Sequence, residues 1–356
     1  MLNGDNDKFL LGGWESISER RYLMVADKDY AIATLGSHSA LQILKGARDE
    51  GFKTIAVSVR DHSFIYRHFN VADKIIEIPS YNEFLKAEDE LLKENAILVP
   101  HASLVAYLDA DIINGIRVPY YGNRKILSWE SDRNKQREWL ERAGLNVPRL
   151  YESPEEIDRL CIVKFQGAKG GQGYFLARDE DEFIRKIGSA KDFVIQEYIV
   201  GVPVYVHYFY SVIRDELELM GFDRRYESNV DAISRLPADL QSDLKITYTI
   251  VGNIPLVLRE SLLPKVFDIG HRVVEVSKEI CSPGLFGPFC LETVVTSELR
   301  FYVFEISARI VAGTNVFMEG SPYANLKHGK SMSTGRRIAI EIKEAIQQDR
   351  LREVLG

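Results

Sequence analysis

Two acids interrupt the apolar stretch between Phe286 and Asn315, and this stretch constrains the fold of the chain more than any other. It has the pattern of two apolar strands joined by a polar turn at 296–298. If the turn is symmetric, Glu292 and Glu305 are equidistant from its centre and lie directly opposite each other, about 4.5–5.5 Å apart. Like charges so placed are destabilising, and burial of an unpaired carboxylate costs free energy or raises its pKa.

A divalent cation would remove this penalty, because Mg²⁺ is typically held by one or two carboxylates together with substrate phosphates. The hairpin is therefore predicted to form one wall of a site for a metal–nucleotide complex, with Glu292 and Glu305 as metal ligands. The alternative is that one strand is twisted and a glutamate pairs with an arginine such as Arg309. The metal prediction depends on the register, because a shift of one residue turns one carboxylate to the other face.

Length and composition limit the class of protein. A chain of 356 residues is expected to form two or three domains, and its net charge of −7 argues against nucleic acid or an anionic membrane as the main partner. Cys161, Cys281 and Cys290 lack metal or redox spacing, which fits a reduced, cytoplasmic protein. No apolar run is long enough for a membrane helix, and no signal peptide is evident. Residues 1–28 are expected to be an extension with at most one helix, at Trp14–Met24.

Strands and helices alternate over the first 100 residues of the chain. This pattern predicts a parallel sheet, whose ligands bind at the carboxyl ends of the strands. The expected strands are Asp29–Leu35, Lys53–Val59, Ala72–Ile78 and Ala96–Pro100, and the expected helices are Ala40–Glu50 and Tyr81–Asn95.

Polar side chains follow two of these strands. In the sequence GSHS, Gly36 permits a tight turn and the next backbone N–H groups open a helix, which makes an anion site. His38 is a candidate to bind phosphate or to polarise a substrate carbonyl, whereas the alternative is that Ser37 or Ser39 only caps the helix. We favour a functional site, because the second strand end carries Ser103 within a similar His-Ala-Ser sequence.

A glycine-rich turn at 167–173 follows a strand that carries Lys164. Such a turn between antiparallel strands lets backbone N–H groups approach phosphates closely, and Lys164 and Lys169 add positive charge. It is neither a Walker A loop nor a spaced G-x-G-x-x-G, so a flexible surface turn is the alternative. The strand Phe193–Tyr198 is a candidate to bind an adenine edge through its backbone.

Two polar segments interrupt the apolar strands in the middle of the chain. The segment 223–229 is either a solvated turn or a site in which Arg224, Arg225 and Glu227 face a phosphoryl group. The segment 251–255 is a second polar interruption. Long helices are expected at Leu263–Ile280 and Thr334–Gln348.

The order of these motifs resembles the ATP-grasp superfamily and, within it, the archaeal PurP family of 5-formaminoimidazole-4-carboxamide ribonucleotide synthetases. The resemblance covers about residues 31–340 and rests on phrases such as LGSHSALQILKGA, VPHASLVAY, VKFQGAKGGQGYF, DRRYESNVDAI, GPFCLE and FEISARIVAGTN. It implies an α/β (α+β) ATP-grasp fold with a Rossmann-like preATP-grasp domain at 29–123 and an ATP-grasp domain at 124–356. A nucleotide-clamping subdomain is expected at about 155–200.

The resemblance also implies an activity. The enzyme would phosphorylate formate with ATP, and the amine of 5-aminoimidazole-4-carboxamide ribonucleotide (AICAR) would attack the formyl phosphate, without folate, in the synthesis of IMP. A homo-oligomer is implied, with a hexamer as one expected form. The alternatives are an ATP-grasp ligase for another carboxylate and amine, and a catalytically silent nucleotide-binding copy.

Site residues follow from the same resemblance. The implied AICAR contacts are His38, Ser103 and Asn253, and the implied ligands of Mg²⁺ (or Mn²⁺) are Glu292 and Glu305. The implied nucleotide contacts are Lys164, Lys169, Gly170, Gly171, Gly173, Gln196, Glu197, Tyr198, Ile199 and Glu227. Arg225 and Arg309 are the candidate catalytic residues, because phosphoryl transfer needs positioning and charge neutralisation.

Overall fold

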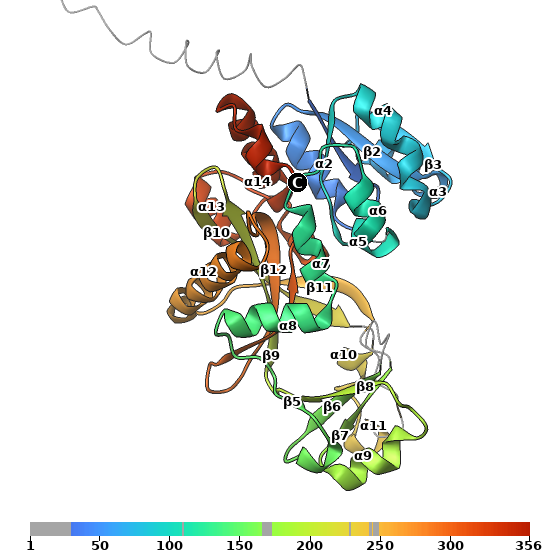
Figure 1. Ribbon diagram of the computed structural model, residues 1–356, viewed down its shortest axis with the longest axis vertical. Coiled ribbons are helices and arrows are strands. Elements are labelled where there is room, and N and C mark those ends of the chain that lie inside the picture. Colours follow the sequence, from blue (N-terminus) through green and yellow to red (C-terminus); the bar gives the residue numbers. More distant parts are fainter. Residues whose placement is uncertain (1–29, 109, 166–172, 228, 242–243, 245–248) are drawn as a thin grey trace, which may run out of the picture.

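The computed structural model describes residues 30–356 apart from 109, 166–172, 228, 242–243 and 245–248. The expected helix Trp14–Met24 and the glycines at the tip of the 167–173 turn lie outside the described residues. The described parts of the chain form three sheets, which Figure 1 shows stacked along the long axis of the molecule. Within those parts, no helix has the length and apolar character that a membrane crossing requires.

The first sheet is parallel, as predicted, with strand order β3-β2-β1-β4. Its strands are β1 (Ala31–Leu35), β2 (Lys53–Val59), β3 (Lys74–Ile78) and β4 (Ala96–Leu98). Its helices are α2 (Ala40–Asp49), α3 (Arg60–His68), α4 (Glu88–Lys93), α5 (Ala102–Tyr107) and α6 (Ala110–Gly115). The expected helix Tyr81–Asn95 is divided, because non-helical backbone at Glu83 leaves a 3-10 segment, Tyr81–Ala87, before α4.

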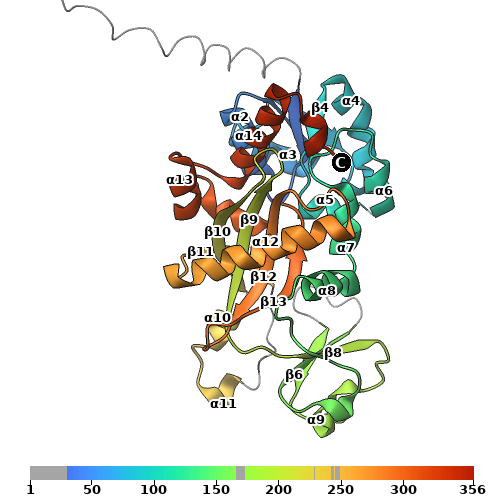
Figure 2. The same ribbon diagram turned by 60° about the vertical axis from the view of Figure 1, so that its left-hand side comes forward.

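The central sheet is antiparallel, with strand order β11-β10-β9-β12-β13. Its strands are β9 (Val202–Ser211), β10 (Glu216–Glu227), β11 (Ile250–Leu256), β12 (Gly287–Val295) and β13 (Phe301–Ser307). The helices nearby in sequence are α10 (Val230–Ile233), α11 (Ala238–Gln241), α12 (Leu263–Ile280), α13 (Pro322–His328) and α14 (Thr334–Gln347). Figure 2 shows α12 crossing one face of this sheet.

Residues 223–227 of the first polar segment are not a turn, because β10 continues as far as Glu227. The segment 251–255 is likewise part of the edge strand β11, rather than an interruption. Both remain strands because alternate side chains of a strand point to opposite faces, so polar residues can line a cavity on one face while the ladder continues.

The third sheet is small and has strand order β5-β8-β6-β7. Its strands are β5 (Leu150–Tyr151), β6 (Cys161–Phe165), β7 (Tyr174–Ala177) and β8 (Phe193–Glu197), and it follows helices α7 (Leu127–Glu130) and α8 (Arg133–Arg142). With α9 (Glu180–Ile187) it encloses its own small core around Val163, Phe183 and Ile195. The domain limits at 123 and at about 155–200 stay predictions.

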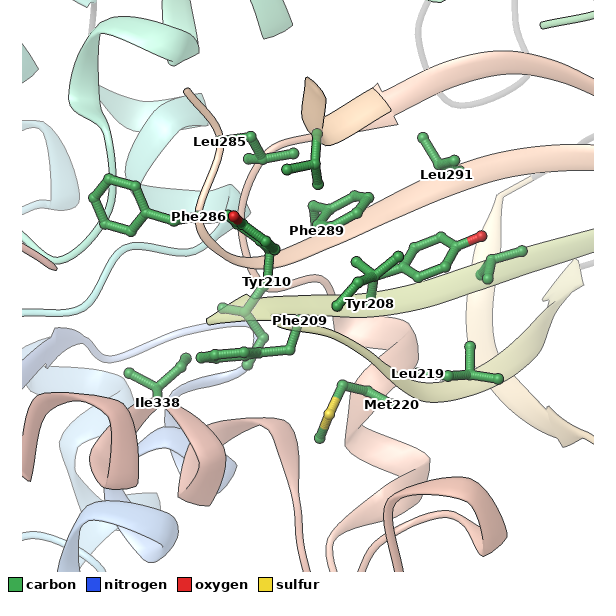
Figure 3. Packing of buried hydrophobic residues seen from close by; sticks show 14 of the residues in the cluster. Tyr208, Phe209, Tyr210, Leu219, Met220, Leu285, Phe286, Phe289, Leu291 and Ile338 are labelled. Carbon is green, nitrogen blue, oxygen red and sulfur yellow. The ribbon is translucent and has the colours of Figure 1, made fainter. Parts of the chain in front are cut away.

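A continuous apolar core joins the first sheet to the central sheet, and Figure 3 shows part of it, including Phe209 on β9 and Ile338 on α14. Helices α2 and α14 meet at two glycines. A Cβ on Gly46 would lie 2.2 Å from the backbone nitrogen of Arg336, and one on Gly335 would lie 2.2 Å from the carbonyl oxygen of Gln42. This close crossing sets the first sheet against the central one.

Candidate active site

A cavity of ≈ 220 Å³ lies where the central sheet meets the strand ends of the first sheet. Strands β9 to β13 and the loop after β13 supply most of its wall, and the first sheet adds His38 and Ala102. The lining residues of the central part are Tyr205, His207, Asp223, Arg225, Ile250, Asn253, Cys290, Glu292, Glu305, Ser307, Arg309, Val311, Ala312 and Gly313.

The register of the central sheet arranges the polar lining residues in rows. Tyr205 pairs with Asp223 on one side and with Glu292 on the other, and Glu292 pairs with Glu305. In the next row His207 pairs with Cys290, which pairs with Ser307. Because strand side chains alternate between faces, both rows project from the same face of the sheet.

Glu292 and Glu305 are directly opposite each other, as predicted. However, the symmetric turn on which this prediction was based does not explain why the two residues are opposite each other. Near the turn Val295 pairs with Phe301 and Thr293 with Val303, a register that would place Phe304 opposite Glu292. The register shifts beyond Thr293, so Phe304 is an extra residue, and this bulge brings Glu305 into position.

The two carboxylates differ in environment. Glu292 is 3% exposed, whereas Glu305 is exposed at the mouth of the cavity. Burial, followed by the charge of Glu305, raises the pKa of Glu292 to about 8, while Arg225 and Arg309 act in the opposite direction. A cation would favour the ionised form of both groups, so this pair fits a divalent metal. Among the described residues, no group of three or more acids, histidines or cysteines is placed to hold a metal ion.

The arginines of the cavity are already held by other residues. Arg225 donates a hydrogen bond to Glu292, and its guanidinium lies 4.1 Å from the centre of the Tyr205 ring. Arg309 forms an ion pair of 2.8 Å with the buried Glu130. A glutamate of the hairpin does pair with an arginine, as in the alternative, but the arginine is Arg225 rather than Arg309.

The two strand ends of the first sheet come together, as their positions predicted. His38 stacks on His101 with 5.5 Å between ring centres, and the hydroxyls of Ser37 and Ser103 lie 3.0 Å apart. His38 adopts a left-handed φ of 52°, and Asn315 donates a hydrogen bond of 3.1 Å to its carbonyl oxygen. Burial, followed by His101 and Arg309, lowers the pKa of His38 to about 3, so this imidazole is neutral at pH 7.

His101 has a structural explanation. Its Nε2 donates a hydrogen bond of 2.7 Å to the carbonyl of Leu35, and its Nδ1 accepts one of 3.2 Å from the backbone N–H of Ser103. Both ring nitrogens are therefore occupied in holding the two strand ends together.

Sequence reasoning missed Tyr205, His207 and Asp223 as cavity residues. His207 Nε2 and Asp223 Oδ1 lie 2.6 Å apart, and Asn253 donates a hydrogen bond of 2.7 Å to Asp223 Oδ2. A signal was present, because Tyr205 and His207 are two residues apart in the apolar strand VPVYVHYFY. Residues at that spacing share one face of a strand.

Of the predicted nucleotide residues that the structure describes, Lys164, Gln196 and Glu197 lie on the small sheet, and none is part of the cavity lining. Lys164 donates a hydrogen bond of 3.0 Å to Gln196. Burial and Arg133 lower the pKa of Lys164, while Glu305 and Glu292 oppose this shift, so the ammonium group is close enough to interact with the acidic pair.

The remaining nucleotide candidates are more dispersed. The Glu197 carboxylate forms an ion pair of 3.3 Å with Arg159. Tyr198 and Ile199 directly follow β8. Glu227 ends β10 and is half-buried, and this burial raises its pKa. Gly173 has φ of 76° where the glycine-rich turn enters β7, whereas Lys169, Gly170 and Gly171 lie outside the described residues.

Comparison with known proteins gives the relationships of the chain. Two family models match it, "Protein of unknown function (DUF1246)" over residues 32–151 and "Domain of unknown function (DUF1297)" over residues 178–356. The chain is 55% identical over 337 residues to the 5-formaminoimidazole-4-carboxamide-1-(beta)-D-ribofuranosyl 5'-monophosphate synthetase of Pyrococcus abyssi, which covers 91% of this chain and 98% of the relative. It is 46% identical to the synthetase of that name from Methanocaldococcus jannaschii, covering 96% of this chain and all (100%) of the relative.

Solved structures agree with these relatives. An IMP biosynthesis protein PurP from Thermococcus kodakaraensis superposes with a TM-score of 0.76 and 33% identity, over 91% of this chain and 100% of that chain. The ADP complex of an N5-carboxyaminoimidazole ribonucleotide synthetase, purK, superposes with a TM-score of 0.66 over 90% of this chain and 78% of that chain. Its 15% identity shows the fold alone, which is the ATP-grasp fold that the motifs predicted. With half-identical relatives that it matches almost end to end, the chain belongs to the PurP family of 5-formaminoimidazole-4-carboxamide ribonucleotide synthetases.

Proposed function

We propose that this protein is an ATP-dependent ligase that joins formate to the amine of AICAR in IMP biosynthesis, through formyl phosphate and without folate. The products are 5-formamidoimidazole-4-carboxamide ribonucleotide, ADP and phosphate. The observation that carries the proposal is the composition of one cavity, in which an acidic pair and two arginines face a histidine from the first sheet. Such a cavity has one end suited to phosphates and another suited to an uncharged heterocycle.

The phosphate end would be built by Glu292, Glu305, Arg225 and Arg309. Glu292 and Glu305 would hold Mg²⁺ (or Mn²⁺), which neutralises charge on the phosphates of ATP when bound. Arg225 is fixed by Glu292 and the Tyr205 ring, and Arg309 is fixed by Glu130. Cations held in place before the reaction stabilise developing phosphoryl charge without reorganising, which is the main requirement of phosphoryl transfer.

ATP itself would lie between the small sheet and the central sheet. Lys164, held by Gln196, would reach the phosphates together with Lys169, Gly170, Gly171 and Gly173 of the glycine-rich turn. The backbone of Gln196, Glu197, Tyr198 and Ile199 would contact the adenine, and Glu227 would contact the nucleoside. The support for this placement is electrostatic, because Lys164 interacts with Glu292 and Glu305 from the opposite sheet.

AICAR would bind at the strand ends of the first sheet through His38, Ser103 and Asn253. His38 is neutral at pH 7, so it can accept or donate a hydrogen bond to the carboxamide or to the amine. Ser103 opens α5, where its hydroxyl meets that of Ser37. Asn253 lines the same cavity from β11, on the central sheet.

Purified protein with ATP, Mg²⁺, formate and AICAR tests the proposal. The expected result is one formylated nucleotide for each ADP released, with no added folate and with dependence on both formate and AICAR. ADP release that needs neither substrate, or formylation only with folate, would contradict it. We also place the protein in the cytoplasm as a homo-oligomer, a hexamer being the expected form; light scattering of the purified protein measures that assembly.

A further inference from the structure

His207 is a buried histidine with one unused nitrogen inside the candidate active site. It is 1% exposed and lines the cavity from β9. Its Nε2 lies 2.6 Å from Asp223 Oδ1, whereas its Nδ1 is buried and has no hydrogen-bond partner. Since a carboxylate only accepts, Asp223 requires the proton of the neutral imidazole to be on Nε2, which leaves the lone pair on Nδ1.

Asp223 is itself held from two directions. Asn253 donates to its second oxygen at 2.7 Å, and the loop after β13 packs directly against the pair. A Cβ at Gly313 would lie 2.2 Å from Asp223 Oδ1 and 2.9 Å from His207 Cε1, so only a glycine allows this approach. The carboxylate and the imidazole therefore have a fixed relative orientation.

A purely structural role does not account for this arrangement. His101, which has such a role, uses both ring nitrogens for hydrogen bonds. A buried polar atom without a partner costs about 1–3 kcal/mol, and a ligand of the cavity that His207 lines would remove this cost by donating a hydrogen bond to Nδ1. His207 shares the cavity with the acidic pair and with His38, where the proposed function puts the phosphates and AICAR. It lies two residues, about 7 Å, along β9 from Tyr205, the strand partner of Glu292.

We propose that Nδ1 of His207 accepts the proton of the attacking amine, with Asp223 as the positioning residue that holds the required tautomer. This inference rests on the proposed function. The lone pair of the amine nitrogen forms the new N–C bond to the formyl carbon, the C–O bond to phosphate breaks, and its electron pair leaves with the phosphate. One amine proton moves to Nδ1, and the resulting imidazolium is stabilised by Asp223 until the proton leaves with the products.

His207→Gln separates this role from binding and from the first chemical step. Glutamine keeps a hydrogen-bond acceptor but cannot take a proton, so kcat for formylation of AICAR should fall by about 10²–10⁴ while KM for AICAR changes little. Hydroxylamine is a strong nucleophile that needs no base, so replacing AICAR with it reports the supply of formyl phosphate alone. Formohydroxamate from ATP, formate and hydroxylamine should stay within about threefold of the wild-type rate.

His328→Gln is the matched control, because His328 is also a largely buried histidine paired with an acid, Glu218 at 2.8 Å, but it is not part of the cavity lining. His328→Gln should leave the ratio of the AICAR formylation rate to the formohydroxamate rate unchanged. Equal losses of both reactions in His207→Gln, or no loss of formylation, would overturn the assignment. Absence of formohydroxamate with the wild-type protein would instead contradict the proposed function, and this inference with it.

Asp223→Asn provides an independent variant of similar shape. Its carbonyl oxygen must face the amide of Asn253, so its amide nitrogen faces Nε2 of His207 and forces the proton onto Nδ1. Formylation should fall by about 10²–10⁴ while formohydroxamate is retained. Retention of both reactions in this variant would show that the tautomer has no part in the transfer.

Discussion

Glu292 and Glu305 face each other across β12 and β13 only because Phe304 is an extra residue in β13. Without the bulge, the register near the turn would place Phe304 opposite Glu292. With the bulge, Glu305 takes that position and two carboxylates face each other. Bulges commonly re-aim side chains next to active sites. Here the result is a buried acid, Glu292, whose pKa burial raises to about 8, beside an exposed acid on the same face.

Glu305→Gln tests the acidic pair. The variant keeps the side-chain shape but removes one charge, so we expect kcat to fall by about 10²–10³ at saturating Mg²⁺, with no fall in the melting temperature. Glu298→Gln, at the exposed turn of the same hairpin, is the control and should retain full activity. Steady-state kinetics over a Mg²⁺ series measures both. Full activity of Glu305→Gln would remove this residue from the metal site.

His38→Ala tests the acceptor end of the cavity. Loss of one hydrogen-bonding group to a bound heterocycle should raise KM for AICAR about 5- to 30-fold and leave KM for ATP nearly unchanged. The exposed His68 lies on α3 outside the cavity lining, and His68→Ala is expected to behave like the wild type. Equal increases of both constants in His38→Ala would contradict the assignment of this end to AICAR.

Glu218 should make the protein acid-sensitive. Burial alone would raise its pKa, but hydrogen bonds and charges from His328 and Arg337 lower the pKa to about 2. An unfolded glutamate protonates near its ordinary value of 4.5, so the stabilisation is complete above that pH and is lost as the pH falls from 4.5 towards 2. The shift corresponds to about 3 kcal/mol.

Urea unfolding at pH 6 and pH 3 checks this expectation. Glu218→Gln should be less stable at pH 6 and should lose less stability than the wild type between the two pH values. Glu216→Gln is the control, since Glu216 is only partly buried and pairs with Lys327 at the surface. If Glu218→Gln lost as much unfolding free energy between pH 6 and pH 3 as the wild type, other groups would be responsible for the acid sensitivity.

Gly46→Ala tests the helix crossing that joins the first and central sheets. In a solvent-exposed helix this change stabilises by up to about 1 kcal/mol, but here the added Cβ would lie 2.2 Å from the backbone of Arg336. Since backbone cannot move aside as a flexible side chain can, we expect a net destabilisation of about 2 kcal/mol or more by thermal unfolding. Gly115→Ala, with nothing within 4 Å of its Cβ, should be neutral or mildly stabilising, and a stabilised Gly46→Ala would show that the helices separate easily.

Local patterns predicted much of the fold. The predicted bounds of Lys53–Val59 and Leu263–Ile280 match the structure, because an apolar run or a 3.6-residue period with clear ends needs little help from tertiary contacts. The pattern was misleading at 223–229 and 251–255, where polar residues resembled loops. Residues 223–227 and 251–255 belong to strands, and Asp223, Arg225 and Asn253 line a cavity that forms only when the sheet assembles.

The cavity residues also differ in whether the sequence motifs pointed to them. The motifs located Glu292, Arg225 and His38, since each interrupts or ends an apolar strand. They did not locate His207 or Asp223, because the hydrogen bond between them joins two strands, and its unpaired nitrogen becomes apparent only in the assembled sheet.

From the sequence alone, the resemblance of the motifs implied the family and the ATP-grasp fold, and short-range periodicity predicted individual helices and strands. Only the tertiary structure decided that Phe304 is a bulge, that Arg225 rather than Arg309 pairs with Glu292, and that His207 has an unused nitrogen. The physical reason is that strand register, ion pairing and burial are set by contacts between residues far apart in the chain, which a linear pattern does not encode.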